Sequence, residues 1–138
     1  MAHWLFKSEP FKWSWDNQVA AGEKGTFWDG VRNHSAKLNM KAMRLCEQGF
    51  FYHSNEGLEV VGIVEVVREA YPDPALEPSE PWVLVDLKAV KPLPRPVSLV
   101  QVKATPELAK MSLVTSMRLS VQPVTDEEWA LMCKMGGL

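Results

Sequence analysis

A run of β-branched residues from Val60 to Val67 most constrains what this chain can fold into. Val and Ile at nearly every position are typical of a strand that is buried on both faces, so this segment is predicted to be a central strand. Gly62 interrupts the run and predicts either a bulge or a close approach by neighbouring backbone. The fold must therefore supply partner strands at both edges and cover both faces.

Other segments supply those partners. Apolar or alternating patterns predict strands at His3–Phe6, Phe50–Asn55, Trp82–Val90 and Met117–Pro123, with the second strand ending in a turn at Asn55-Glu56-Gly57 and the third ending at Pro92, Pro94 and Pro96. Helical spacing and capping residues predict helices from Ser14 to Gly22, from Asn33 to Gln48 with Gly49 as its stop, from Thr105, and from Thr125 to Gly136. The proline-rich segment Tyr71–Pro81 is expected to be a loop.

These patterns favour an α+β fold. Several predicted strands are joined by turns of hairpin length, which favours a mixed or antiparallel sheet over a doubly wound parallel one. A small curled sheet or barrel with flanking helices fits this order. The length of 138 residues predicts a single domain, residues 1–138, with a proper core.

Composition narrows the class of function. The net charge of −2 argues against binding long nucleic acid mainly through its phosphates, but it is compatible with recognition of a single base. Cys46 and Cys133 lie in apolar helical patterns and are expected to be reduced core thiols of a cytoplasmic protein. No apolar run approaches a membrane span, and no metal-ligand spacing is present, so no membrane, metal or cofactor is expected.

The most informative polar stretch combines two aromatics with an acid, a glycine, a base and an amide: Phe27-Trp28-Asp29-Gly30-Val31-Arg32-Asn33. A Trp face beside hydrogen-bonding groups suits a flat ligand with polar edges, such as a nucleobase. Gly30 permits a sharp turn, and Asn33 is placed to cap the following helix. The structural alternative is that Trp28 packs in the core and Arg32 pairs with a carboxylate.

Other candidate binding residues fall into three clusters and one isolated aromatic: Lys7-Ser8-Glu9, Tyr52-His53-Ser54-Asn55, the polar face formed by Arg118, Ser120 and Gln122, and Tyr71 in the proline-rich segment. Each has a structural alternative. Lys7 and Glu9 could be a solvated strand end. Tyr52 could belong to the core, and His53 could be a satisfied structural histidine. The face that contains Arg118 could be an ordinary solvent-exposed face of the sheet, and Tyr71 could anchor its loop.

No catalytic constellation is visible. His53 and Ser54 are neighbours on a predicted strand and therefore point to opposite faces, so they cannot form a nucleophile–base pair. There is no nucleophile elbow and no phosphate-binding glycine loop. The sequence therefore favours a non-enzymatic binding module. Two alternatives stay open: a small nucleotide-acting enzyme that uses Glu9 or Asp29 as its base, and a purely structural domain whose Trp28 has no cavity beside it.

Several segments taken in order resemble the EVE-domain family, small bacterial proteins of the PUA-like superfamily. The matching stretches run nearly end to end: Trp4–Pro10, Trp28–Asn33, Phe50–Asn55, Gly62–Val67, Glu69–Asp73 and Arg118–Val124. The resemblance implies a PUA-like curved mixed β-barrel of five or six strands with flanking helices.

The resemblance also implies kinship with YTH domains, which hold a methylated adenine in an aromatic cage. The Lys-Ser pair and the Trp of that pocket correspond here to Lys7, Ser8 and Trp28. The YTH cage takes further Trp residues from a later loop, where this chain offers Tyr71. EVE domains are thought to be readers of modified bases, so the expected partner is a modified nucleobase or nucleotide in DNA or RNA. The resemblance does not imply any particular protein partner.

Overall fold

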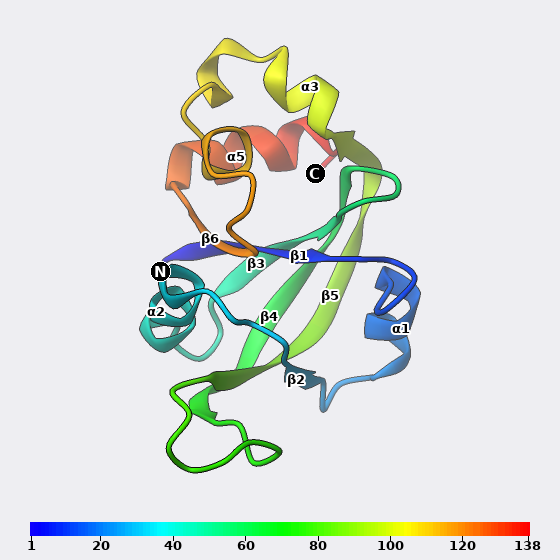
Figure 1. The fold of residues 1–138 in the computed structure, drawn as a ribbon. Helices are drawn as coiled ribbons and strands as arrows, with labels where there is room; N and C mark the ends of the chain where they lie inside the picture. Colours follow the sequence, from blue (N-terminus) through cyan, green and yellow to red (C-terminus); the bar gives the residue numbers. More distant parts are fainter.

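A single six-stranded sheet organises the computed structural model, which describes residues 1–138 (Figure 1). The strand order is β2-β5-β4-β3-β1-β6, with β1 parallel to β3 and all other neighbours antiparallel. The elements are β1 (His3–Ser8), α1 (Trp15–Ala20), β2 (Thr26–Trp28), α2 (His34–Ala42), β3 (Gln48–His53), β4 (Glu59–Pro72), β5 (Val83–Ser98), α3 (Leu99–Lys103), the 3-10 turn η1 (Pro106–Leu108), α4 (Ser112–Thr115), β6 (Val121–Val124) and α5 (Asp126–Met135). The sheet is mixed and curls into a half-barrel, which confirms the predicted α+β class with a curved mixed sheet and flanking helices.

Both faces of the sheet are covered, and strand β1 shows the consequence most clearly. Trp4 and Phe6 point into a core shared with α1 and α2, whereas Leu5 points into a second core shared with α3, η1, α4 and α5. In Figure 1 helices α3 and α5 accordingly lie on the opposite side of β1 from α1 and α2. A strand between two cores must be apolar at successive positions, which explains why Trp4, Leu5 and Phe6 are all apolar.

Gly62 fixes the position of α1. The register between β4 and β5 shifts between Val60 and Gly62, so the predicted bulge is confirmed. A Cβ atom at Gly62 would overlap the indole of Trp15, the first residue of α1. The missing side chain therefore lets α1 pack directly on the sheet, and the loop before α1 is carried to the open end of the half-barrel.

Two strands are longer than predicted. Strand β4 continues to Pro72, and β5 runs through all three prolines to Ser98 instead of ending at Pro92. Pro94 and Pro96 are tolerated because the β4–β5 ladder jumps from the Gly62–Pro92 pair to the Val60–Val97 pair, so the residues between make no regular ladder bonds. The proline φ angle is compatible with extended backbone, and the strand continues.

Helix α2 is shorter than predicted. It ends at Ala42, and Gly49, the expected stop, lies in β3 instead. The cause is Glu47, which is buried and accepts hydrogen bonds from the backbone N–H groups of Ala2 and Arg44, both at 2.9 Å, and from the Trp4 indole at 3.0 Å. This tertiary network outweighs the local helical pattern.

Two further expectations are corrected in the same way. Cys46 is exposed on the turn after α2, with a φ of 71°, so it is not a core thiol; Cys133 is half-buried. The strand predicted from Met117 is β6, which begins only at Val121, because residues 117–120 form a turn in which Leu119 N–H donates to the Ser116 carbonyl. Helices α3 and α4 and the short strand β2 have no counterpart in the prediction. The capping boxes at Ser14 and Thr125 are present.

Candidate functional site

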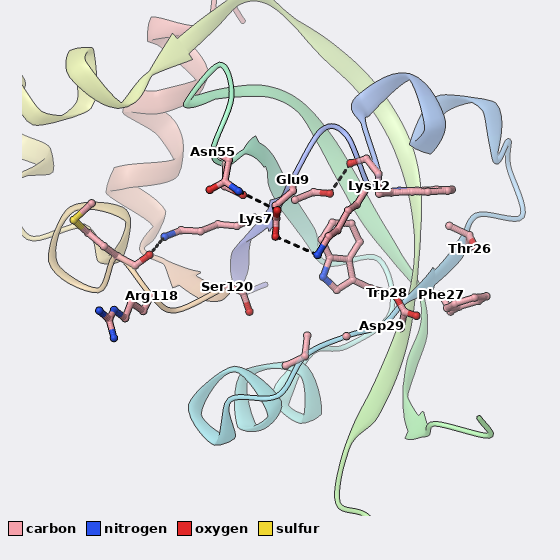
Figure 2. Close-up of a pocket in the computed structure, with 16 residues that line it drawn as sticks. Lys7, Glu9, Lys12, Thr26, Phe27, Trp28, Asp29, Asn55, Arg118 and Ser120 are labelled. Atoms are coloured by element: carbon pink, nitrogen blue, oxygen red, sulfur yellow. Dashed lines mark hydrogen bonds and ion pairs between the residues drawn. The ribbon is translucent and has the colours of Figure 1, made fainter. Parts of the chain in front are cut away.

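A cavity of about 600 Å³ lies at the open end of the half-barrel (Figure 2). Its walls come from the end of β1, the loop before α1, β2 and the segment after it, the β3–β4 turn, and the turn before β6. The lining residues are Lys7, Ser8, Glu9, Lys12, Trp13, Thr26, Phe27, Trp28, Asp29, Gly30, Val31, Ser54, Asn55, Met117, Arg118 and Ser120. Most of the residues predicted from sequence are therefore brought together, although they come from five separate segments.

Trp28 lies between the core and the cavity. Successive residues of β2 alternate, so Phe27 is exposed while Trp28 is only 8% exposed. The Trp28 ring meets Phe6 and Phe51 edge-on, with centroids 5.4 and 5.7 Å away, and these contacts fix its orientation. The ring is thus mostly buried, but it also lines the cavity. The purely structural alternative required no cavity beside it.

The end of β1 supplies the polar groups on one side of the cavity. Ser8 is buried, and its hydroxyl donates to the Trp13 carbonyl at 2.5 Å. The Lys7 ammonium donates to the Met117 carbonyl at 2.5 Å, and desolvation by burial lowers the pKa of Lys7. Lys7 forms no ion pair with a carboxylate. A cation of this kind retains donors for an incoming ligand.

Glu9 is held at the rim of the cavity rather than free inside it. Its carboxylate accepts a hydrogen bond from the Asn55 amide at 2.9 Å and pairs with Lys12 at 3.6 Å. Figure 2 shows these contacts as dashed lines across the upper part of the cavity. The contacts connect the loop before α1 with the β3–β4 turn, so they shape the entrance.

The segment after β2 forms another wall. Gly30 has a φ of +75°, a conformation that favours glycine, and it turns the chain from β2 towards α2. Val31 is buried, whereas Asp29 is exposed. Asn33 is the N-cap of α2, as predicted, and accepts from the Ala36 N–H at 3.0 Å. The cap fixes where the wall ends and the helix begins.

Several lining residues were missed by sequence analysis: Lys12, Trp13, Thr26, Phe27 as a lining residue, and Met117. Trp13 is the most important, because it adds a second tryptophan to the cavity. The buried amide of Gln18 holds Trp13: its oxygen accepts from the Trp13 indole at 2.9 Å, and its nitrogen donates to the Leu87 carbonyl at 2.9 Å. A tryptophan in the polar segment just before the Ser14 cap was the available signal.

Six predicted residues do not line this cavity: Arg32, Asn33, Tyr52, His53, Tyr71 and Gln122. Gln122 is fully buried, and its amide nitrogen lies 2.9–3.2 Å from the carbonyl oxygens of Ser112, Ser116 and Leu119. Gln122 therefore anchors the turn before β6 from within the core and does not lie on a solvent-exposed face of the sheet.

His53 and Tyr52 also have structural positions. The His53 Nε2 accepts the Trp15 backbone N–H at 3.1 Å, and burial lowers the pKa of His53 although Glu59 and Asp16 oppose this. Tyr52 is 3% exposed in the second core and lines a smaller cavity of about 220 Å³ next to the first. Both positions agree with the structural alternatives.

Tyr71 and Arg32 lie beyond the cavity. Tyr71 is on β4 and donates to the Asp86 carboxylate of β5, and the Arg68 guanidinium lies 3.6 Å from its ring centroid. Desolvation, together with the bond to Asp86, raises the pKa of Tyr71 to about 12. Arg32 donates to the Val31 carbonyl at 2.9 Å and lies over the ring of Trp82, not against a carboxylate.

The ionisable side chains of the fold do not form a metal centre. No group of three or more His, Cys, Asp or Glu side chains is placed to hold a metal ion. None of the helices has the length and apolar character needed to cross a membrane.

Comparison with known proteins places the chain in a family. The EVE domain model matches residues 2–135. Human thymocyte nuclear protein 1 is 36% identical over 159 residues, which covers 93% of this chain and 71% of the relative. The crystal structure of a protein from Agrobacterium tumefaciens is 61% identical, with a TM-score of 0.97 over 100% of this chain and 94% of that one.

Two further solved structures are informative. The human THYN1 protein in complex with 5-methylcytosine-containing DNA is 33% identical, with a TM-score of 0.90 over 100% of this chain and 99% of that one. The YTH domain of Zygosaccharomyces rouxii MRB1 is 15% identical, with a TM-score of 0.57 over 98% of this chain and 86% of that one, so it shares the fold alone. The EVE domain model thus matches this chain nearly end to end. With the fold described above, this match shows that the chain belongs to the EVE domain family.

Proposed function

We propose that this chain is a binding module that takes a modified nucleobase of a nucleic acid into the 600 Å³ cavity. The observation that carries the proposal is the pairing of two tryptophans, Trp13 and Trp28, with polar groups at the cavity's edge. A volume of this size is within the range of small-molecule sites. The related human protein solved with 5-methylcytosine-containing DNA makes methylated DNA the first ligand to test.

The physical basis is stacking plus methyl burial. Stacking a base on an aromatic side chain contributes about 1–3 kcal/mol, and this contribution does not depend on which base is bound. Burying one extra methyl group contributes about 0.8 kcal/mol, which corresponds to a roughly fourfold preference for the methylated base. Stacking therefore supplies most of the affinity, and burial of the methyl group supplies the selectivity.

The polar groups of the cavity select the base edge. Three residues that line the cavity, Lys7, Ser54 and Asn55, carry side chains that can form hydrogen bonds. A buried donor left without a partner costs about 1–3 kcal/mol, so a base with the wrong edge is disfavoured. In a duplex the target base must leave the stack to reach these groups.

The test is a fluorescence-anisotropy titration with short duplexes that differ only in 5-methylcytosine against cytosine. Wild type is expected to prefer the methylated duplex at least about fourfold. Trp13→Ala is expected to weaken binding by about 1–3 kcal/mol, whereas Trp13→Phe, which keeps a flat ring, serves as the matched control. The proposal would be rejected if wild type bound both duplexes equally and also bound single strands with other methylated bases no more tightly than their unmethylated counterparts.

The enzyme alternative places Glu9 or Asp29 as a general base. Both residues line the cavity. The Glu9 carboxylate, however, is tied to Asn55 and Lys12 at the rim, and Asp29 is exposed to solvent. Glu9 therefore shapes the entrance and Asp29 belongs to the outer wall, and neither is held as a general base would be against a reacting atom. For this reason we favour binding over catalysis.

A further inference from the structure

A group of basic side chains surrounds one indole just outside the cavity. The Arg32 guanidinium lies 5.7 Å from the ring centroid of Trp82 and the Lys37 ammonium 5.9 Å from it. The His34 ring lies 5.0 Å away and is tilted by 35°. We call Arg32, His34, Lys37 and Trp82 the Trp82 cluster. The proposed base cavity uses none of these side chains.

The charges of this cluster are locally unfavourable. Arg32 and Lys37 stand at the start of α2, where the helix dipole disfavours cations, and the first turn of α2 contains no acidic residue. None of the ion pairs of the structure involves Arg32 or Lys37. Helix α5 of the same chain shows the ordinary arrangement, with three acidic residues in its first turn. Two unpaired cations held over one indole at a helix start form a surface that suits an anionic partner.

The cluster is continuous with the cavity. Val31 lines the cavity and Arg32 is the next residue, so their Cα atoms are about 3.8 Å apart. A nucleotide whose base enters the cavity leaves its phosphates outside the entrance, because the charged backbone is not buried with the base. The strand must therefore leave across one of the cavity walls. Of the basic residues that line the cavity, Lys12 is paired with Glu9, whereas Lys7 and Arg118 have no carboxylate partner. Arg32 and Lys37 are also unpaired, and they differ from those two because both lie over one indole beside the cavity wall.

We infer that the Trp82 cluster binds the phosphodiester backbone next to the base held in the cavity. Arg32 and Lys37 contact phosphates, and Trp82 positions both cations through their contacts with its ring. This inference rests on the proposed function and adds the route of the strand along the start of α2. Phosphate contacts of this kind position a nucleic acid and carry no base information.

The experiment uses the salt dependence of binding, which counts phosphate contacts. Arg32→Gln combined with Lys37→Gln is compared with Lys103→Gln combined with Lys110→Gln. The control pair lies around α3 and η1, on the other side of the sheet from α2 (Figure 1), and it removes the same net charge. Each protein is titrated with the methylated and the unmethylated duplex between about 50 and 200 mM NaCl. Circular dichroism checks that each variant is folded.

The expected result is a shallower salt slope for the Arg32/Lys37 variant, by about 0.9 for each lost contact. Wild type should then lose about 12-fold more affinity than this variant over the fourfold rise in salt. The control pair should keep the wild-type slope, and the preference for the methylated duplex should be the same in all three proteins.

The possible outcomes separate this inference from the proposed function. A shallower slope in the Arg32/Lys37 variant without any methyl preference in wild type supports the backbone route and rejects the base reader. A retained methyl preference with identical slopes in wild type and the Arg32/Lys37 variant overturns the backbone route and leaves the base reader standing. Equal slope changes in both double variants also overturn it, since the effect would then come from net charge. Failure of wild type to bind either duplex overturns both.

Discussion

Replacing Gln18 by leucine tests whether the wall of the cavity is held from inside the core. Gln18 is fully buried, and its amide bridges the Trp13 indole and the Leu87 carbonyl, each at 2.9 Å. Leucine is similar in size but can make neither bond. Each orphaned polar group costs about 1–3 kcal/mol. The bond to the Trp13 indole is only partly buried, whereas the bond to Leu87 is buried, so we expect a total loss of about 2–4 kcal/mol.

A loss of this size is large for a domain of 138 residues. At about 3–5 °C for each kcal/mol, the melting temperature should fall by roughly 6–20 °C. The measurement is thermal unfolding followed by circular dichroism. Gln101→Leu is the matched control: the Gln101 amide caps α3 through the Ser98 N–H but is exposed, so its loss should cost about 0.5–1 kcal/mol.

The same variant has a consequence for binding. Without Gln18 the Trp13 ring loses the bond that fixes its orientation, so affinity for the methylated duplex should fall at a temperature where the variant is still folded. The loss should approach that of Trp13→Ala, because both changes remove the same fixed wall. A melting temperature within about 2 °C of wild type, together with unchanged affinity, would show that the bridge does not hold the wall.

Three further predictions concern the scaffold around the cavity. Gly62→Ala should destabilise the fold by about 1–3 kcal/mol in a denaturant titration, because the added carbon overlaps the buried Trp15 ring; an unchanged midpoint would contradict the close packing of α1 on β4. Burial acts to raise the pKa of Glu47, but its three hydrogen bonds lower it overall, so its stabilising effect is present above the ordinary pKa of 4.5 and is lost as the pH falls through the folded value. Glu47→Gln should therefore reduce the dependence of the unfolding free energy on pH below about 4.5, and a pH profile parallel to that of wild type would refute this account. Tyr71 should titrate near pH 12 by ultraviolet absorbance, and Asp86→Asn should bring its pKa down towards 10 because the carboxylate that opposes phenolate formation is gone; equal titration midpoints would exclude the Tyr71–Asp86 bond.

The candidate site divides into a part that the sequence could indicate and a part that it could not. Lys7 and Asn55 were singled out as polar residues at predicted strand ends, and Trp28 because two aromatics run directly into a polar stretch; all three line the cavity. Gln122 was also singled out, by alternation, but residues 117–120 turn before β6 begins, and this turn draws Gln122 into the core. Trp13 lies in a short loop with no periodicity, and so no pattern assigned it a direction.

Local chemistry by itself determined most of the strands of this chain and three of its helix starts. The β-branched run placed a central strand, the bulge at Gly62 was predicted, and the capping residues Ser14, Asn33 and Thr125 marked three helix starts, because these signals act within a few residues of backbone. Only the tertiary structure decided where the elements end and which side chains face the cavity. Those outcomes depend on contacts between distant segments, such as the Glu47 network that ends α2 and the Gln18 bridge that fixes Trp13, and the cost of leaving a buried polar group unpaired exceeds the weak preferences of the local sequence.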